Sequence, residues 1–129
     1  MAVRAAPNVA VGDVFLVRRE DIGGFGTHPT RPCLVVELQG PASTPARAIV
    51  VPGSRRVLPS NWPYLTAAGD EAGLEVETYF KFQHYAALGI RRLAYATRIG
   101  RLSGLRIEEI ARLLKEAKEN FGPGRASPR

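Results

Sequence analysis

The sequence predicts a mainly β (α+β) domain, a small barrel of five to six short strands with one amphipathic helix at its C-terminal end. Ten prolines and thirteen glycines separate short apolar runs, which is typical of a β-rich chain with many turns. The segment 74–82 alternates apolar and polar residues with a period of two, as a strand with one solvated face does. Helical periodicity follows residue 103.

The first half of the chain contains three apolar runs that we interpret as strands. The earliest covers 14–17, and a loop containing three glycines is expected over 19–30. Two further strands are expected near 33–38 and 48–51. Because these two runs are continuously apolar, they should be buried on both faces or closed in a barrel.

The second half contains the alternating strand, a last strand over 93–100 and the terminal helix. The apolar side of the alternating strand would be formed by Leu74, Val76, Thr78, Phe80 and Phe82. Ser103 is the expected N-cap of the helix, because its hydroxyl can accept a hydrogen bond from the first turn. The apolar stripe of the helix comprises Ile107, Ile110, Leu114, Ala117 and Phe121.

The length of 129 residues fits one domain, which we place at 1–121 with a flexible tail over 122–129. No stretch is long and apolar enough for a membrane span. Pro7 and Asn8 interrupt the apolar region that a secretion signal requires. We therefore expect a cytoplasmic protein, in which the single cysteine, Cys33, is a small core residue.

The net charge of +6 is unevenly distributed. Residues 91–106 contain five arginines and no acid, a pattern that attracts polyanions because each guanidinium can donate two hydrogen bonds to a phosphate. The alternative is an arginine-rich composition whose charges are merely solvated.

Several kinds of site are not supported by the sequence. The glycines of the loop over 19–30 are not followed by the Lys-Ser/Thr pair of a nucleotide-binding loop. Two histidines and one cysteine lack the spacing of zinc ligands. We therefore expect neither a metal nor a nucleotide cofactor.

Polar side chains at two strand ends suggest a site instead. Arg31 precedes the apolar run 33–38, and Pro32 fixes the backbone beside it. After the run 48–51, Pro52 introduces Ser54. If these ends converge, a guanidinium and a hydroxyl would meet at one anion.

The order of short motifs resembles the MazF/PemK (Kid) family of bacterial toxins. The chain has GDVFLV, then RPCLVVE, then AIVVPGS and finally RIGRLS before the last helix. This corresponds to the family's Gly-Asp-hydrophobic strand, Arg-Pro strand, Val-Pro-x-Thr/Ser turn and Gly-Arg-Leu-Ser helix start. The likeness covers roughly residues 11 to 120.

The resemblance implies an SH3-like barrel that forms a homodimer, cleaves single-stranded RNA without metal and is neutralised by an antitoxin with an acidic disordered tail. It also implies that Arg31 is the catalytic arginine and Ser54 the hydroxyl residue. Arg31 would clamp the phosphate while Ser54 donates to a non-bridging oxygen. Candidate contacts to the RNA backbone are Arg55, Arg56, Arg91 and Arg92.

The chain departs from the family at one strand. Many relatives have Arg-x-Asp-Gln there, whereas FKFQH keeps Gln83 and places Phe80 and Phe82 at the arginine and aspartate positions. Alternation puts Glu77 and Lys81 on the opposite face of that strand, so they are poor replacements.

Histidines are further candidates for proton transfer. Either His28 or His84 could carry the proton near neutral pH, and the sequence does not decide between them. Trp62 and Tyr64 either stack on RNA bases or are core or dimer aromatics.

A second hypothesis comes from a different class of protein. The chain would then be a barrel of the same fold that binds nucleic acid or a protein partner without catalysis.

Overall fold

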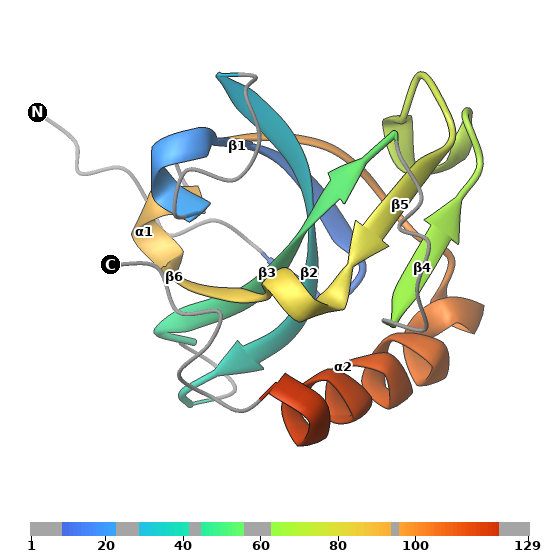
Figure 1. Cartoon of the computed structure of the whole chain (residues 1–129). Helices are drawn as coiled ribbons and strands as arrows, with labels where there is room; N and C mark the ends of the chain where they lie inside the picture. Colours follow the sequence, from blue (N-terminus) through green and yellow to red (C-terminus); the bar gives the residue numbers. More distant parts are fainter. Residues whose placement is uncertain (1–8, 23–28, 42–44, 56–62, 94–95, 122–129) are drawn as a thin grey trace, which may run out of the picture.

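Seven strands form one curled, barrel-like antiparallel sheet in the computed structural model, and the longest helix lies along one side of it (Figure 1). The structure describes residues 9–22, 29–41, 45–55, 63–93 and 96–121. The strands are β1 (Asp13–Arg18), β2 (Thr30–Gln39), β3 (Arg47–Ser54), β4 (Tyr64–Ala67), β5 (Thr78–Lys81), β6 (Ala86–Gly89) and β7 (Thr97–Arg101).

Two α-helices and four short 3-10 turns complete the described part of the chain. The helices are α1 (Ile90–Leu93) and α2 (Ile107–Phe121). The turns are η1 (Arg19–Ile22), η2 (Glu71–Gly73), η3 (Phe82–His84) and η4 (Gly104–Arg106). The mainly β class and the C-terminal helix are thus confirmed, with one strand more than the five to six expected.

The strand β3 connects the two parts of the sheet. The strand order is β4-β5-β3-β2-β1-β7, and β6 also pairs with β3. Residues 47–50 of β3 pair with β6, whereas its last two residues, Gly53 and Ser54, pair with β5. The end of β3 is therefore where the β4–β5 hairpin joins the rest of the sheet.

Alternate residues of β2 and β3 pack into two separate hydrophobic clusters, one on each side of the sheet. Leu34 and Val51 belong to the cluster that α2 covers. Cys33 and Val50 belong to the other cluster, together with residues of α1 and η1. All four of these residues have no exposed surface. The expectation that both continuously apolar runs are buried on both faces is confirmed, as is that of a buried Cys33.

The terminal helix is amphipathic, and Ser103 caps the 3-10 turn η4 that leads directly into α2 rather than α2 itself. The Ser103 hydroxyl accepts a hydrogen bond from the Leu105 backbone nitrogen at 3.2 Å, one turn before α2. Ile110, Leu114 and Ala117 are buried. The expected inward position of Ile107 is wrong, because this side chain is 36% exposed at the first residue of α2.

The alternating segment is strand over only part of its length, so the prediction over 74–82 is too long. β5 is limited to Thr78–Lys81 because its hairpin partner β4 has four residues and ends at Ala67, opposite Thr78. Val76, expected inside, is 39% exposed in the preceding connection. Phe82 is buried as expected, but in η3 rather than in a strand.

The last predicted strand begins later than expected. Residues Ile90–Leu93 form α1, and β7 covers Thr97–Arg101 rather than 93–100. The predicted flexible tail over 122–129 lies outside the described residues and stays a prediction. In the part of the chain that the structure describes, no helix has the length and apolar character needed to cross a membrane.

Candidate functional site

Arg31 and Ser54 lie on the same side of the sheet, at one end of the β2–β3 pair. Cys33 and Pro52 are the last pair of the β2–β3 ladder at this end, and continuing this antiparallel register by two residues would place Arg31 opposite Ser54. The Arg31 side chain reaches across to β3, and its Nη1 atom donates a hydrogen bond to the Gly53 carbonyl oxygen at 2.9 Å. Both Arg31 and Ser54 are half-buried.

The hydrogen bond to Gly53 positions a cation without neutralising it, because a carbonyl oxygen carries no net charge. Partial burial lowers the pKa of Arg31 from its usual value, yet an arginine remains protonated near neutral pH. The neighbouring Cys33 responds in the opposite direction: burial raises the pKa of its thiol to about 12, against the lowering effect of the Arg31 charge. Cys33 is therefore a neutral thiol beneath a charged guanidinium.

Gly53 allows β5 to approach this strand end closely. A Cβ atom at Gly53 would lie 2.5 Å from Thr78 Cγ2 and 2.9 Å from Phe80 Cε1, distances that no side chain can accommodate without displacement of its neighbours. The absence of a side chain at this residue therefore lets Phe80 pack directly over the end of β3, and the next pair, Ser54 and Tyr79, follows in register.

Two tyrosines extend this side of the sheet from Ser54 to its edge. Tyr79 pairs with Ser54 on one side and with Thr66 on the other. Cross-strand partners share a face of the sheet, so these side chains point the same way. Tyr64, two residues before Thr66, packs edge-to-face on Tyr79 with ring centroids 5.8 Å apart and an interplanar angle of 70°. We call the set Arg31, Ser54, Tyr79 and Tyr64 the Arg–Tyr row.

Glu77 brings a carboxylate to the same side. The Tyr79 hydroxyl donates to Glu77 Oε1 at 2.6 Å, and this hydrogen bond is the main cause of a raised pKa of Tyr79. Glu77 and Lys81 do lie opposite Phe80 and Phe82, as alternation predicts. Alternation alone predicts that they are poor replacements for the family's arginine and aspartate, but Ser54 pairs with Tyr79 and therefore lies on their side of β5 rather than on the Phe80 side. The register between β3 and β5, which the sequence does not reveal, determines which face of β5 lies on the same side of the sheet as Ser54.

The residues at the family's arginine and aspartate positions point into the protein. Phe80 and Phe82 have no exposed surface and belong to the cluster covered by α2. Gln83, which matches the family pattern, is 4% exposed, and its side-chain amide has no hydrogen-bond partner within the described residues. None of the three contributes to the Arg–Tyr row.

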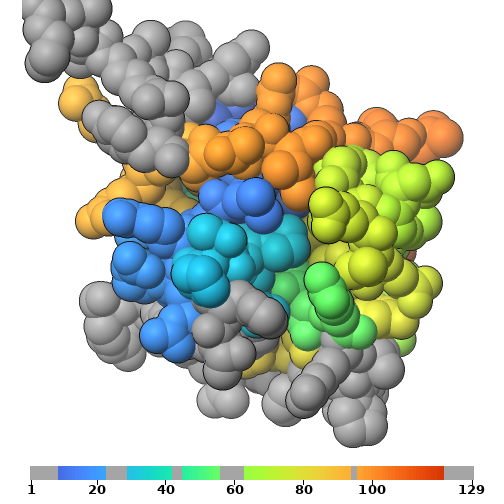
Figure 2. Space-filling view, turned by 90° about the horizontal axis from the view of Figure 1, so that it is seen from above, coloured from blue at the N-terminus to red at the C-terminus, as the bar shows by residue number. Residues whose placement is uncertain are grey.

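Viewed from above, the segments of the Arg–Tyr row share one face of the molecule. Figure 2 shows the start of β2 in cyan, the end of β3 in green and the β4–β5 region in yellow-green, side by side, with β7 in orange along their upper border. Arg55, directly after β3, is exposed.

Arg91 and Arg92 lie away from this row. They are exposed residues of α1, which Figure 2 shows at the edge of the face beyond β1 and η1, on the side opposite β4 and β5. Arg92 Nη1 is paired with Asp21 Oδ1 at 2.8 Å. The structure thus brings together Arg31, Ser54 and Arg55 but not the two arginines of α1.

Most of the arginines in the acid-free stretch 91–106 meet acids from other segments. Arg101 and Arg98 both pair with the fully buried Asp13 of β1, Arg101 through a short hydrogen bond and Arg98 at 3.7 Å. The hydrogen bond and charge of Asp13 raise the pKa of Arg101. Two arginines on one carboxylate leave one net positive charge on β7, which β1 separates from β2.

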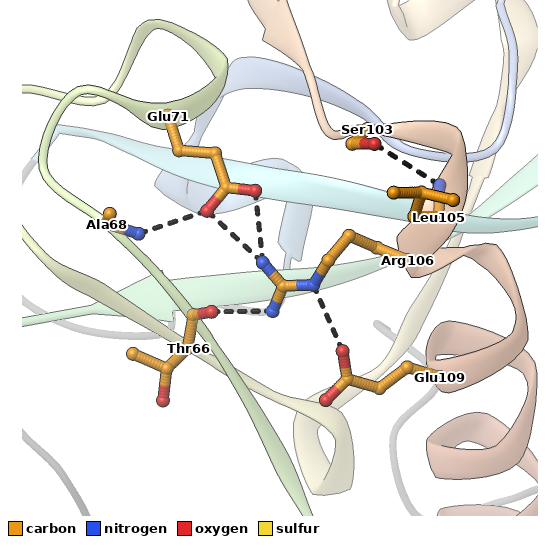
Figure 3. Close-up of polar contacts among 7 residues, drawn as sticks. All are labelled: Thr66, Ala68, Glu71, Ser103, Leu105, Arg106 and Glu109. Atoms are coloured by element: carbon orange, nitrogen blue, oxygen red, sulfur yellow. Dashed lines mark hydrogen bonds and ion pairs between the residues drawn. The ribbon is translucent and has the colours of Figure 1, made fainter.

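The Arg106 side chain makes contacts that join separate elements of the fold. Its guanidinium contacts Glu71 and Glu109 and donates to the Thr66 carbonyl oxygen at 2.7 Å (Figure 3). It is one-quarter exposed. Arg106 therefore connects the start of α2 to η2 and β4, and is not available to an RNA.

The remaining predicted site residues are outside the row or outside the described chain. His84 is exposed in η3, which follows β5 and packs against α2, β3 and β4 (Figure 1). His28, Arg56 and Trp62 lie outside the described residues. Among the residues that the structure describes, no group of three His, Cys, Asp or Glu side chains could hold a metal ion.

The chain matches no protein-family model, and no curated protein matches it either.

Proposed function

We propose that the chain is a metal-independent endoribonuclease, the toxin component of a type II toxin–antitoxin system, with an SH3-like barrel similar to that of the MazF/PemK family. Its substrate is single-stranded RNA. The observation that carries this proposal is the 2.9 Å hydrogen bond from Arg31 Nη1 to the Gly53 carbonyl, because it holds a cation beside Ser54 on a partly solvated face.

The reaction needs few groups. The ribose 2′-oxygen attacks the adjacent phosphorus, the 5′-oxygen leaves, and the products are a 2′,3′-cyclic phosphate and a 5′-hydroxyl. Arg31 stabilises the negative charge that builds on the phosphoryl oxygens, and Ser54 donates a hydrogen bond to a non-bridging oxygen. Arginine suits this role because its planar fork can donate two parallel hydrogen bonds.

Two proton transfers complete the chemistry, because one group must accept the 2′-hydroxyl proton and a protonated group or water must donate a proton to the leaving 5′-oxygen. Glu77 supplies a carboxylate on the Ser54 side of β5, held by Tyr79 at 2.6 Å, and His28 and His84 are the imidazole candidates. The pH dependence of kcat/KM separates them. An acid limb near pH 4 to 5 indicates a carboxylate, and a limb near about 6.5 indicates a histidine.

The direct test is cleavage of a mixed-sequence single-stranded RNA in the presence of EDTA. We expect fragments ending in cyclic phosphate, and a loss of roughly 100- to 1,000-fold in kcat for Arg31→Ala, the range seen when one transition-state donor is removed. Ser54→Ala should lose activity and Ser54→Thr should keep it.

Arg112→Ala is the matched control for charge, since Arg112 is an exposed arginine on α2. Cleavage by Arg31→Ala at the wild-type rate would contradict the proposal.

The proposed partners follow from the same site. An antitoxin with an acidic disordered tail would compete with RNA for Arg31. A homodimer has twice the 14.0 kDa mass of the chain, which light scattering measures directly. A cytoplasmic location is part of the proposal.

A second candidate is a barrel that binds nucleic acid or a protein partner without cutting RNA. It is favoured by one observation: Phe80 and Phe82 are fully buried at the positions where relatives carry an arginine and an aspartate. RNA binding without cleavage, unchanged over the pH range above, would support this alternative.

A further inference from the structure

We infer that Tyr64 and Tyr79 form a stacking platform for a nucleobase of single-stranded RNA, adjacent to the phosphate bound by Arg31 and Ser54. The inference rests on the proposed function, because its ligand is the RNA bound at that site. It adds a base-binding surface that the reaction itself does not require.

The platform continues the phosphate site across the sheet. Tyr79 is the direct cross-strand partner of Ser54, and the Cβ atoms of such partners lie about 4.5–5.5 Å apart. Tyr64 is the diagonal neighbour of Tyr79 on β4. Since one ribose separates a base from its phosphate, a base next to a phosphate at Ser54 reaches the two tyrosine rings.

The two rings are held in place before any ligand binds. They pack edge-to-face at 5.8 Å, an arrangement that aromatic pairs prefer. The Tyr79 hydroxyl is fixed by Glu77 at 2.6 Å. Tyr64 remains 38% exposed on the edge strand of the sheet. An exposed ring of fixed orientation loses little conformational entropy when a base stacks on it.

Core packing does not explain these rings. On the described part of the chain, neither tyrosine belongs to the two hydrophobic clusters. The buried apolar residues of the same two strands, Leu65, Ala67 and Phe80, point to the other side. Lys81, the cross-strand partner of Tyr64, is 6% exposed on the tyrosines' own side. Arg31 and the exposed Arg55 give the neighbouring strand end a positive charge, which complements a phosphate backbone and favours RNA over an apolar peptide as the occupant.

The test is binding of a fluorescent ten-nucleotide single-stranded RNA to the full chain, followed by anisotropy. The RNA carries 2′-O-methyl groups throughout, so that it binds but offers no 2′-hydroxyl for cleavage. The variants are Tyr64→Leu and Tyr79→Leu, and the matched controls are Tyr64→Phe and Tyr79→Phe, which keep the ring. A second oligonucleotide of the same length lacks all bases but keeps its phosphates.

Each leucine variant should raise the Kd for the RNA by about fivefold or more, the lower end of the effect of one lost base stack. Each phenylalanine variant should stay within about twofold of wild type. The leucine variants should bind the base-free oligonucleotide as the wild type does. Unchanged RNA affinity of the leucine variants overturns the platform. The platform is also overturned if the leucine variants lose as much affinity for the base-free oligonucleotide as for the RNA. The same holds if the phenylalanine variants lose as much affinity for the RNA as the leucine variants do.

Cleavage of unmodified RNA by the same proteins separates this inference from the proposed function. Tyrosine-dependent binding without any cleavage by the wild type keeps the platform and removes the nuclease. Cleavage by the wild type with tyrosine-independent binding keeps the nuclease and removes the platform. Failure of the wild type to bind any RNA overturns both.

Discussion

Asp13 is a fully buried carboxylate that connects the N-terminal turn to β7. It accepts a hydrogen bond from the Ala10 backbone nitrogen at 2.9 Å and pairs with Arg101 and Arg98. Replacement by asparagine keeps the shape but removes the charge and one acceptor. We expect Asp13→Asn to lower the free energy of unfolding by about 1–3 kcal/mol, measured by urea denaturation. Glu75→Gln, at an exposed residue, should change it little, and equal effects would contradict this role.

Cys33 should make the stability depend on pH above about 9. The pKa of its thiol is about 12 in the folded chain against a reference value of 9.0, so the unfolded chain loses its proton first as pH rises. The stabilisation is complete below pH 9 and is lost between 9 and 12, at about 1.4 kcal/mol per pH unit. In urea titrations, the free energy of unfolding of Cys33→Ala should fall less steeply with pH than that of the wild type between pH 9 and 12. Between pH 6 and 8 the two proteins should show the same pH dependence. Equal slopes above pH 9 would exclude the effect.

Individual residues of the site differ in how far the sequence reveals them. Arg31 and Ser54 stand out because each is a polar residue at the end of a long apolar run. Tyr79 does not, since its position opposite Ser54 depends on which residues of β3 and β5 pair, and Glu77 is linked to the site only through the Tyr79 hydroxyl. That register brings Phe80 close to Gly53, a tertiary contact that periodicity along one strand does not contain.

The start of α2 is fastened to the edge strand β4 by Arg106. Its side chain reaches Glu71 at 3.0 Å and the Thr66 carbonyl at 2.7 Å (Figure 3). The second of these bonds uses a carbonyl on the outer edge of the sheet, where an unpaired strand is otherwise open to association.

We expect Arg106→Met, which keeps the aliphatic stem, to cost about 2 kcal/mol because several charged hydrogen bonds are lost. Amide hydrogen exchange in β4 should become about tenfold faster or more while exchange in β2 stays unchanged. Arg112→Met is the matched control, since its pair with Glu116 spans 3.9 Å on the exposed face of α2. The same acceleration in both variants would count against a specific role of Arg106.

The turn η2 and the strand β7 meet backbone to backbone, and two glycines make this possible. A Cβ atom at Gly100 would lie 2.2 Å from the Ala72 carbonyl carbon, and one at Gly73 would lie 2.0 Å from the Ile99 carbonyl oxygen. Gly73 also has a φ of +78°, in the region that favours glycine.

Gly100→Ala should therefore destabilise the fold by about 3 kcal/mol or more. Gly104→Ala should change stability by less than about 0.5 kcal/mol, because no atom lies within 4 Å of its added Cβ. Thermal and urea unfolding of the two variants measure the difference, and comparable stabilities would show that the η2–β7 contact can relax.

Long elements with strong periodicity could be predicted, whereas short ones could not. β1, β2, β3 and α2 could be located from the sequence because each contains a clear apolar pattern, although β2 (Thr30–Gln39) and β3 (Arg47–Ser54) extend beyond the predicted runs 33–38 and 48–51. β4 (YLTA) and β6 (AALG) have four residues each, too few to establish a period, and alanine and glycine disfavour strands. Their pairing partners, rather than their own sequences, make them strands.

For the whole molecule, the net charge of +6 predicts that RNA binding weakens with salt. Each neutralised phosphate of a single strand contributes about 0.7 to the slope of log K against log salt concentration. Arg31→Met should therefore reduce the slope by about 0.7. Arg91→Met should leave it unchanged if the bound strand follows the Arg–Tyr row and not α1. A comparable reduction in Arg91→Met would extend the bound strand across β1 to α1.

The sheet that separates the two hydrophobic clusters has a consequence for thermal denaturation. Because neighbouring residues of β2 and β3 alternate between the clusters, melting either side would expose one face of the strands that support the other. The two sides should consequently melt together, as a single calorimetric peak whose van't Hoff and calorimetric enthalpies agree. Substitutions by larger side chains on opposite sides of the sheet, at Ala48 and at Ile49 for instance, should each lower the midpoint temperature of this single transition rather than divide it into two peaks.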